Sequence, residues 1–288
     1  MRTCPYCLNI SYYHFIIASR IFRRCPECDL IYQAPLNSCD EGPSASRMSY
    51  CNENSDEQMQ ASRSDLFNYI LNLLETNQNI GTLMDVGTGC GLFLLAAQGR
   101  GWNAKGVDPS VNSVRMARDK LGLEVTKGTL QGYRKNSEFD VITFINVLDH
   151  SDMPWLEIDM AKNLLRPGGL IYLRFPNGLV HSSVYRIAFQ YGLHNSVRKF
   201  LVFHKYSFTA KYIRRLLRDR GFTEITFYNS PPVLGDPYKI FPNPTISTYI
   251  KRSVHLLAHS AQVLSGGYLL FGPSLEAMAI KKADNYSS

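Results

Sequence analysis

The sequence predicts an α/β protein with a mostly parallel sheet covered by helices on both faces, preceded by a small cysteine-rich unit. Three observations support this: strand-like and helix-like segments alternate, a glycine-rich loop joins one such strand to a helix, and four cysteines stand in two pairs near the N-terminus. Alternation is typical of parallel sheets, because each crossover places a helix on a face of the sheet. The expected strands are 82–87, 103–108, 123–128, 139–145, 169–176, 222–229 and 275–281.

The first element is defined by two C-x-x-C pairs, Cys4 with Cys7 and Cys25 with Cys28, which are separated by seventeen residues. Two short turns at this spacing can present four thiolates to one tetrahedral Zn²⁺. A redox function needs only one such pair, and disulfides are rare in the cytosol. Because cysteine fills all four positions, the predicted zinc is structural. The segment Ser11 to Arg24 between the pairs suits a β-hairpin.

The segments after these cysteines predict the domain organisation. Prolines, glycine and serines follow the second pair, and helical periodicity begins around Ser62. We expect a zinc ribbon over residues 1–40, a linker over 41–61 and a larger domain over 62–288.

The strand at 82–87 runs directly into the loop Asp85-Val86-Gly87-Thr88-Gly89-Cys90-Gly91, and a helix follows from Leu92. Glycines allow the backbone to approach a ligand closely and to adopt positive φ. The next strand ends at Asp108, whose carboxylate can accept hydrogen bonds from both hydroxyls of a ribose. These residues predict a nucleotide-type cofactor site.

Two cofactors compete for this site. A dinucleotide requires G-x-G-x-x-G, but the spacing here is G-x-G-x-G, and Leu92 stands where the third glycine belongs. Asp85 would repel a pyrophosphate, whereas it can bind the cationic amino-acid end of S-adenosylmethionine directly or through water. The pattern therefore favours S-adenosylmethionine.

The glycine loop resembles motif I of the class I, Rossmann-like, S-adenosylmethionine-dependent methyltransferases. Further segments resemble their later motifs in the expected order: Gly106-Val107-Asp108-Pro109-Ser110, Phe139 to Phe144 with Asn146 to His150, Leu164 to Gly169, and Tyr206 to Thr209 with Gly221-Phe222. The two cysteine pairs narrow the likeness to the bacterial subgroup with an N-terminal zinc ribbon. One departure is Asp149, where many relatives carry Glu.

The resemblance implies a seven-stranded Rossmann-like methyltransferase sheet whose last strand, Leu275 to Lys281, runs antiparallel. It also implies that the cofactor is held by Asp85, Gly87, Gly89, Gly91, Asp108, Pro109 and Asn146.

His150 is the candidate general base, because it follows the strand at 139–145 and should reach the carboxyl edge of the sheet. The alternative is a turn histidine that bonds locally before the helix started by Pro154. Asp149 is expected to hold the cofactor or to fix the loop.

Two insertions in the larger domain are expected to determine the substrate. Residues 177–205 are rich in aromatic side chains and suit a cover over the acceptor, and His204 and Tyr206 are the first residues to test there. Residues 231–272 open with prolines and close with an apolar helix over 250–264. Capping the acceptor pocket, peripheral contact with a membrane or lipid-linked substrate, dimerisation and simple packing all remain open for this insertion.

Composition limits the compartment and the partners only broadly. The net charge of +7 suits anionic partners or merely a solvated surface. No secretory signal or apolar run of about 18 residues is present, so we expect a cytoplasmic protein without a transmembrane segment.

Three functions are compatible with this sequence. The first is methyl transfer to a small-molecule or glycan/lipid-linked acceptor. The second, an RNA methyltransferase that grips nucleic acid with the ribbon, is less favoured because no Asn-Pro-Pro-Tyr-like sequence follows the strand at 139–145. The third is a non-catalytic adaptor that retains the fold.

Overall fold

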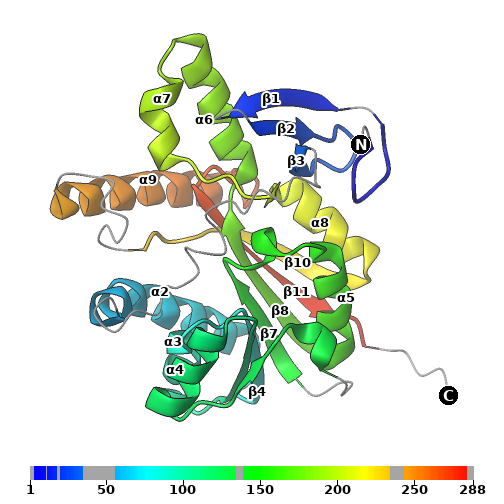
Figure 1. The fold of residues 1–288 in the computed structure, drawn as a ribbon, viewed down its shortest axis with the longest axis vertical. Coiled ribbons are helices and arrows are strands. Elements are labelled where there is room, and N and C mark those ends of the chain that lie inside the picture. The colour runs from blue at the N-terminus through cyan, green and yellow to red at the C-terminus, as the bar shows by residue number, and fades with distance from the viewer. Residues whose placement is uncertain are drawn as a thin grey trace.

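The computed structural model describes residues 3–10, 12–17, 20–34, 56–133, 139–233 and 243–283. Its centre is a seven-stranded sheet with the strand order β10-β11-β8-β7-β4-β5-β6 (Figure 1). The strands are β4 (Thr82–Val86), β5 (Asn103–Asp108), β6 (Val125–Lys127), β7 (Phe139–Ile145), β8 (Leu165–Pro176), β10 (Phe222–Asn229) and β11 (Ser274–Lys281). Only β11 pairs antiparallel, with β8 and β10. The predicted sheet and its antiparallel last strand are confirmed.

Alternate strand residues enter two separate cores, one on each face of the sheet. Leu83 packs with helices α2 (Asp56–Asn77), α3 (Leu92–Gly99) and α4 (Val111–Leu121), whereas its neighbour Met84 packs with α5 (Pro154–Leu164) and α8 (Ala210–Asp219). Val141 lies in the same core as Leu83, and Ile142 lies in the same core as Met84. Burial on both faces explains why the strands are nearly continuous apolar runs.

The N-terminal ribbon, which we define as the described residues of 3–34, forms a second sheet with part of the larger domain. Strands β1 (Tyr13–Ile17) and β2 (Arg20–Arg24) form the predicted hairpin, and β3 (Ile31–Ala34) follows. The two-residue strand β9 (Tyr206–Ser207) completes the order β1-β2-β3-β9. The ribbon is therefore joined to the larger domain by strand pairing.

Helix α2 begins at Asp56, earlier than the expected start near Ser62. The sequence Asp56 to Ala61 lacks the apolar periodicity that predicted the helix, but it contains good helix formers such as Glu, Gln and Met. Residues 35–55, which hold the end of the expected ribbon and most of the expected linker, lie outside the described residues.

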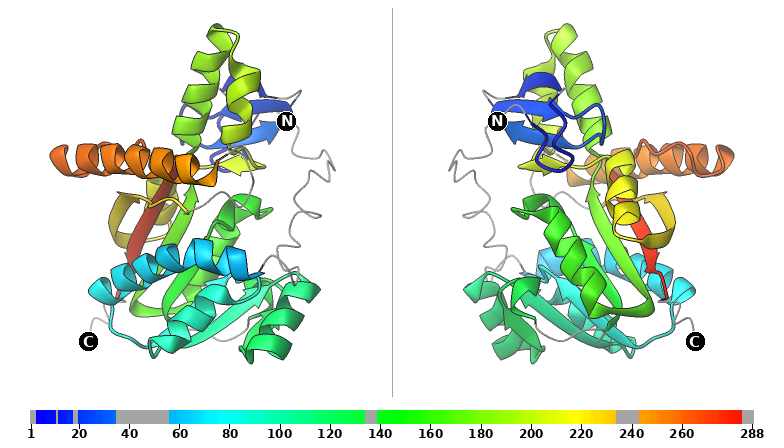
Figure 2. Two further views of the ribbon diagram at one scale, coloured as in Figure 1. Left: turned by 90° about the vertical axis from the view of Figure 1, so that its left-hand side faces the viewer. Right: turned by 90° about the vertical axis from the view of Figure 1, so that its right-hand side faces the viewer.

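Both expected insertions carry helices. The first contains α6 (Gly178–Gln190), α7 (His194–Val197) and the short turn η3 (Arg198–Phe200). The second contains α9 (Pro244–Leu264), which starts six residues before the expected position because the Asn243 side chain accepts hydrogen bonds from the Thr245 and Ile246 N–H groups and Pro244 occupies the first turn. Figure 2 shows α9 projecting from the body of the domain.

Candidate active site

The glycine loop after β4 adopts a conformation that side chains would disturb. Gly87, Gly89 and Gly91 all have positive φ, of 70°, 58° and 82°. A Cβ on Gly87 would lie 2.5 Å from two Val147 methyl carbons, whereas a Cβ on Gly89 would meet nothing within 4 Å. The loop is therefore packed against the chain at Gly87 and faces open space at Gly89, as a loop that receives a ligand must.

Asp85 lies beneath this loop, near the end of β4. Its side chain is only 3% exposed and accepts a hydrogen bond of 2.7 Å from Thr143 Oγ1 on β7. Burial, opposed by hydrogen bonds from Thr143 and Thr88, raises the pKa of Asp85 from 3.8 to about 7. A cation placed beside this carboxyl would favour the ionised form.

Asp108 connects the end of β5 to the glycine loop. One carboxylate oxygen accepts from the Gly89 N–H at 2.8 Å, and the other accepts from the Ser110 N–H at 2.8 Å. Each oxygen keeps further acceptor capacity. Pro109 is exposed beside it. The structure thus brings Asp85, Gly89 and Asp108 together at one edge of the sheet.

Asn146 follows β7 in a left-handed conformation, with φ of 55°, which asparagine tolerates better than most residues. Its side-chain oxygen accepts a 2.8 Å hydrogen bond from Arg174 Nη1, and its N–H donates to the Arg174 carbonyl at 2.9 Å. Arg174, on β8, therefore fixes the start of the segment that leads to the candidate base.

His150 lies at the end of the short turn η2 (Leu148–His150). Its ring lies against the His204 ring, with the centroids 4.0 Å apart. Asp149 is 2% exposed, and its Oδ2 lies 3.5 Å from His204 Nε2. These three groups come from two distant segments, and their ligand atoms lie within 4.8 Å of one another. They are close enough to share a proton or to hold a metal ion.

Burial shifts the pKa values of Asp149 and His204 in opposite directions. It raises the pKa of Asp149, although the neighbouring His150 and Arg174 oppose the shift. It also lowers the pKa of His204 to about 3, with smaller effects from His150 and His181. His204 is therefore a neutral imidazole near pH 7 that packs against the candidate base.

The four N-terminal cysteines form a separate cluster in the ribbon. Cys4 Sγ lies 3.6 Å from Cys28 Sγ, and Cys7 Sγ lies 3.5 Å from Cys25 Sγ. All four sulfur atoms lie within 4.8 Å of one another. Sulfurs around a tetrahedral zinc at about 2.3 Å stand about 3.8 Å apart, so the arrangement fits one such ion.

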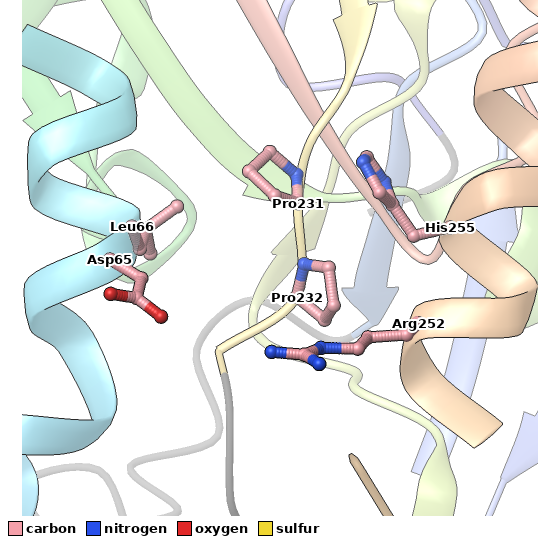
Figure 3. Close-up of a pocket in the computed structure, with 6 residues that line it drawn as sticks. All are labelled: Asp65, Leu66, Pro231, Pro232, Arg252 and His255. Carbon is pink, nitrogen blue, oxygen red and sulfur yellow. The ribbon is translucent and has the colours of Figure 1, made fainter. Parts of the chain in front are cut away.

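An open cavity of about 190 Å³ lies between α2 and α9. Figure 3 shows Asp65 on α2 and Arg252 on α9 directed into it from opposite sides, with Pro231 and Pro232 between them. Arg174 Nη2 donates to the Pro231 carbonyl at 3.2 Å. Arg174 therefore makes hydrogen bonds both to Pro231, which lines the cavity, and to Asn146.

The sequence prediction missed Arg174 as a site residue. Arg174 is 4% exposed, and its Nε donates to Ser230 Oγ at 2.7 Å, which in turn donates to the buried Glu276 at 2.7 Å. The available signal was a single Arg within the apolar run Leu170 to Phe175. His204 was singled out for testing, but nothing in the spacing paired it with His150.

Comparisons with known proteins agree with this geometry. A family model described as a methyltransferase domain matches residues 55–226, more than half of the chain. The ubiquinone biosynthesis O-methyltransferase of Paraburkholderia phytofirmans is 28% identical over 116 residues, which cover 37% of this chain and 49% of that protein. The chain thus spans about half the length of the curated relatives that it matches.

Solved structures show the same fold. Phosphoethanolamine N-methyltransferase 2 of Haemonchus contortus, in complex with S-adenosyl-L-methionine, matches with a TM-score of 0.53 and 14% identity, over 81% of this chain and 58% of that one. A SAM-dependent methyltransferase of Archaeoglobus fulgidus matches with a TM-score of 0.51 and 16% identity, over 78% and 97%. With a family model that covers more than half of its length, this chain belongs to the methyltransferase domain family.

Proposed function

We propose that this protein transfers a methyl group from S-adenosylmethionine to a small-molecule or glycan/lipid-linked acceptor. The observation that carries the proposal is the joint placement of Asp85, the open glycine loop and Asp108 at the carboxyl edge of the sheet. Asp108 suits the ribose hydroxyls, and the glycine loop with Pro109 and Asn146 surrounds the rest of the cofactor. Asp85 suits the cationic amino-acid end.

When bound, S-adenosylmethionine supplies a sulfonium methyl group that is already strongly electrophilic. The residues of this chain then have two tasks: to align the acceptor for in-line attack and to remove its proton. We propose that His150 is the base that accepts the proton of the acceptor. The neutral His204 ring packs against the His150 ring and lies beside the buried Asp149, and Arg174 fixes the start of the segment through Asn146.

The cavity between α2 and α9 is the best candidate for the acceptor path, because it adjoins the Arg174–Pro231 contact. The relative from Paraburkholderia phytofirmans is a ubiquinone biosynthesis O-methyltransferase, which supports an acceptor of small-molecule or lipid type. The acceptor itself stays open within that range.

An RNA acceptor receives less support, because basic residues of α8 are engaged within the protein. Arg214 lies over the Phe227 ring at 4.7 Å, and Arg215 pairs with Glu27 of the ribbon at 2.9 Å. Arg220, directly after the helix, pairs with Asp159 at 2.9 Å. A phosphate backbone would compete with these contacts.

We further propose that Cys4, Cys7, Cys25 and Cys28 bind one structural zinc ion, supported by the sulfur separations. Zinc with four thiolate ligands keeps no open position for catalysis. Metal analysis of the purified protein should give one zinc per chain.

The cofactor assignment is tested by calorimetric titration with S-adenosylhomocysteine. We expect micromolar binding by the full chain, loss of binding in Asp108→Ala, and unchanged binding in Asp119→Ala, which removes an exposed carboxylate from α4. NADH should not bind. Absence of S-adenosylhomocysteine binding by a folded, zinc-loaded protein would favour the non-catalytic adaptor.

The role of His150 is tested separately, with an acceptor found by screening. His150→Gln should leave S-adenosylhomocysteine affinity unchanged and lower kcat. The metal content should stay at one zinc per chain. A second equivalent of metal that disappears in this variant would assign the cluster of Asp149, His150 and His204 to metal binding instead.

A further inference from the structure

Helix α9 has its apolar side turned away from the protein. It packs on the domain through Ser247, Ala258 and Gln262, all buried, and Gln262 Oε1 accepts from the Asn229 N–H at 2.9 Å. The exposed apolar residues recur with helical spacing on the opposite side: Ile246, Tyr249, Ile250, Leu256, Leu257 and Leu264. A surface helix of a globular protein normally has the reverse arrangement, with apolar residues facing the core.

The apolar surface continues beyond the end of the helix. Leu257 is 68% exposed and Leu264 is 87% exposed, and the following residues Tyr268, Leu269 and Phe271 are also exposed. Figures 1 and 2 show α9 projecting past the strands, and the exposure of these residues places them away from the sheet. Contiguous exposed apolar surface of this kind marks an interaction site.

The Lys and Arg residues of α9 have no acidic neighbours in the helix itself, whereas Asp65 of α2 faces Arg252 across the cavity. The sequence 243–275 contains Lys251 and Arg252 but no Asp or Glu, and 160–218 also contains no Asp or Glu. Lys251 is half-buried, and Arg252 borders the cavity shared with α2. At 3.6 residues per turn, Lys251 projects between the buried Ala258 and Gln262, so of these two cations only Arg252 lies between the packed side and the apolar side.

We propose that the apolar side of α9, together with residues 268–271, seats this protein on an anionic membrane surface. An apolar stripe beside an exposed cation such as Arg252 fits a helix that lies in the plane of a bilayer, with the cation at the level of the lipid phosphates. The 21 residues of α9 make a cylinder about 31 Å long. In the part of the chain that the structure describes, no helix is long and apolar enough to cross a bilayer.

Two other occupants fit less well. A second copy of the chain, packed helix against helix, would bring Arg252 toward an equally basic α9, which carries no acidic residue of its own to pair with it. A nucleic acid would require cations on the outward side, but that side carries aliphatic residues such as Ile246 and Leu257.

Docking through α9 would place the cavity beside the lipid head groups, because Arg252 and His255 of the same helix line it. An acceptor with a lipid anchor could then reach the site sideways from the bilayer. This step rests on the proposed function, whereas membrane binding does not. Access from the bilayer would favour lipid-linked acceptors among the classes of acceptor proposed above.

The experiment is co-sedimentation of the full chain with vesicles of phosphatidylcholine alone or mixed with phosphatidylglycerol. The test variant is Ile250→Ser/Leu257→Ser, which changes only the outward side. The control is Ile80→Ser, a 51% exposed apolar residue ahead of β4, at the opposite end of the strands. We expect binding to the anionic vesicles that falls at least tenfold in the double variant and is unchanged in the control.

Titration with S-adenosylhomocysteine and light scattering accompany each variant. Unchanged cofactor affinity in the double variant would show that the loss of vesicle binding does not come from a damaged cofactor site. A failure of the proposed function would instead appear as absent S-adenosylhomocysteine binding by the wild type, and it would leave the sedimentation result unaffected. Equal sedimentation of wild type and double variant would overturn the proposal. So would a dimer that dissociates in the double variant while no form binds vesicles, since a second copy would then be the occupant.

Discussion

The N-terminal ribbon and helix α9 are both additions to the same sheet-and-helix domain, but they are attached in different ways. The ribbon contributes Cys4, Cys25, Cys28, Leu30 and Tyr32 to the same buried core as α5 and α8. It also shares a sheet with β9. No α9 residue among the described ones belongs to either large core, and the helix is held by polar contacts such as those of Gln262.

This difference in attachment indicates that the ribbon and α9 have different roles. An element that continues the core of its neighbour is stabilised by that neighbour and stabilises it in return. An element that keeps its apolar residues outside gains little from the fold, and its sequence serves something beyond it. We therefore expect ribbon variants to alter stability, and variants on the outward side of α9 to alter binding alone.

The largest effect should come from the four-cysteine cluster in the ribbon, the proposed zinc site. Cys25→Ser removes one of four ligands, so we expect loss of zinc and a fall in unfolding free energy of more than about 4 kcal/mol. Because the cores are continuous, thermal unfolding should stay a single transition at a lower temperature. Metal analysis and calorimetry measure both. Tyr13→Ser, on the exposed side of the same hairpin, is the control. Two separate transitions would mean that the ribbon is independent of the domain.

The sequence was sufficient to predict most of the domain and the placement of the glycine loop and Asp108 at one edge of the sheet. Strong local patterns specify the strands, and the glycine loop and Asp108 stand where strands end, so their positions follow from topology. The β3–β9 pairing was not predictable, because two residues, Tyr206 and Ser207, carry no strand pattern. His204 likewise meets Asp149 only through the path of the intervening chain.

Helix α9 shows another limit of sequence patterns. Periodicity indicated an apolar helix near 250–264, but it cannot state which side meets the protein. Here the packed side consists of small and polar residues, with Gln262 bonded to the Phe227 carbonyl at 2.8 Å. The usual assumption that apolar residues face inward would have placed the helix the wrong way round.

The contact between α9 and the sheet gives the next largest effect. Gln262→Ala removes the acceptor for the Asn229 N–H and Nδ2, at 2.9 and 3.0 Å. The buried Asn229 N–H would lose this acceptor, which costs about 1–3 kcal/mol, whereas Nδ2 keeps the Ala258 and Leu269 carbonyls. Urea unfolding measures it against Ser260→Ala, on the exposed side of the same helix. If both variants unfold alike, the polar contact does not hold α9.

The pH dependence of cofactor binding should be independent of both additions. The pKa of Asp85 lies at about 7, so the carboxyl is ionised above that pH and protonated below it. Binding a cationic amino group needs the ionised form, and affinity for S-adenosylhomocysteine should fall by about tenfold at one pH unit below the pKa. Titrations from pH 6 to 8 test this, with Asp85→Asn giving a flat profile. The same profile in Ile250→Ser/Leu257→Ser would confirm that α9 plays no part in cofactor binding, and a shifted profile would contradict the separation.

The smallest effect concerns the surface charges between the ribbon and α8. Arg215 and Glu27 form an ion pair at 2.9 Å, with exposed fractions of 35% and 57%. Solvent screens such a pair, so Arg215→Ala should cost at most about 1 kcal/mol, and its coupling to Glu27→Ala in a double-mutant cycle should shrink at high salt. A larger, salt-sensitive coupling would mean that charge and not the shared core holds the ribbon in place. The ribbon would then resemble α9 more closely, because each would depend on polar contacts with the domain.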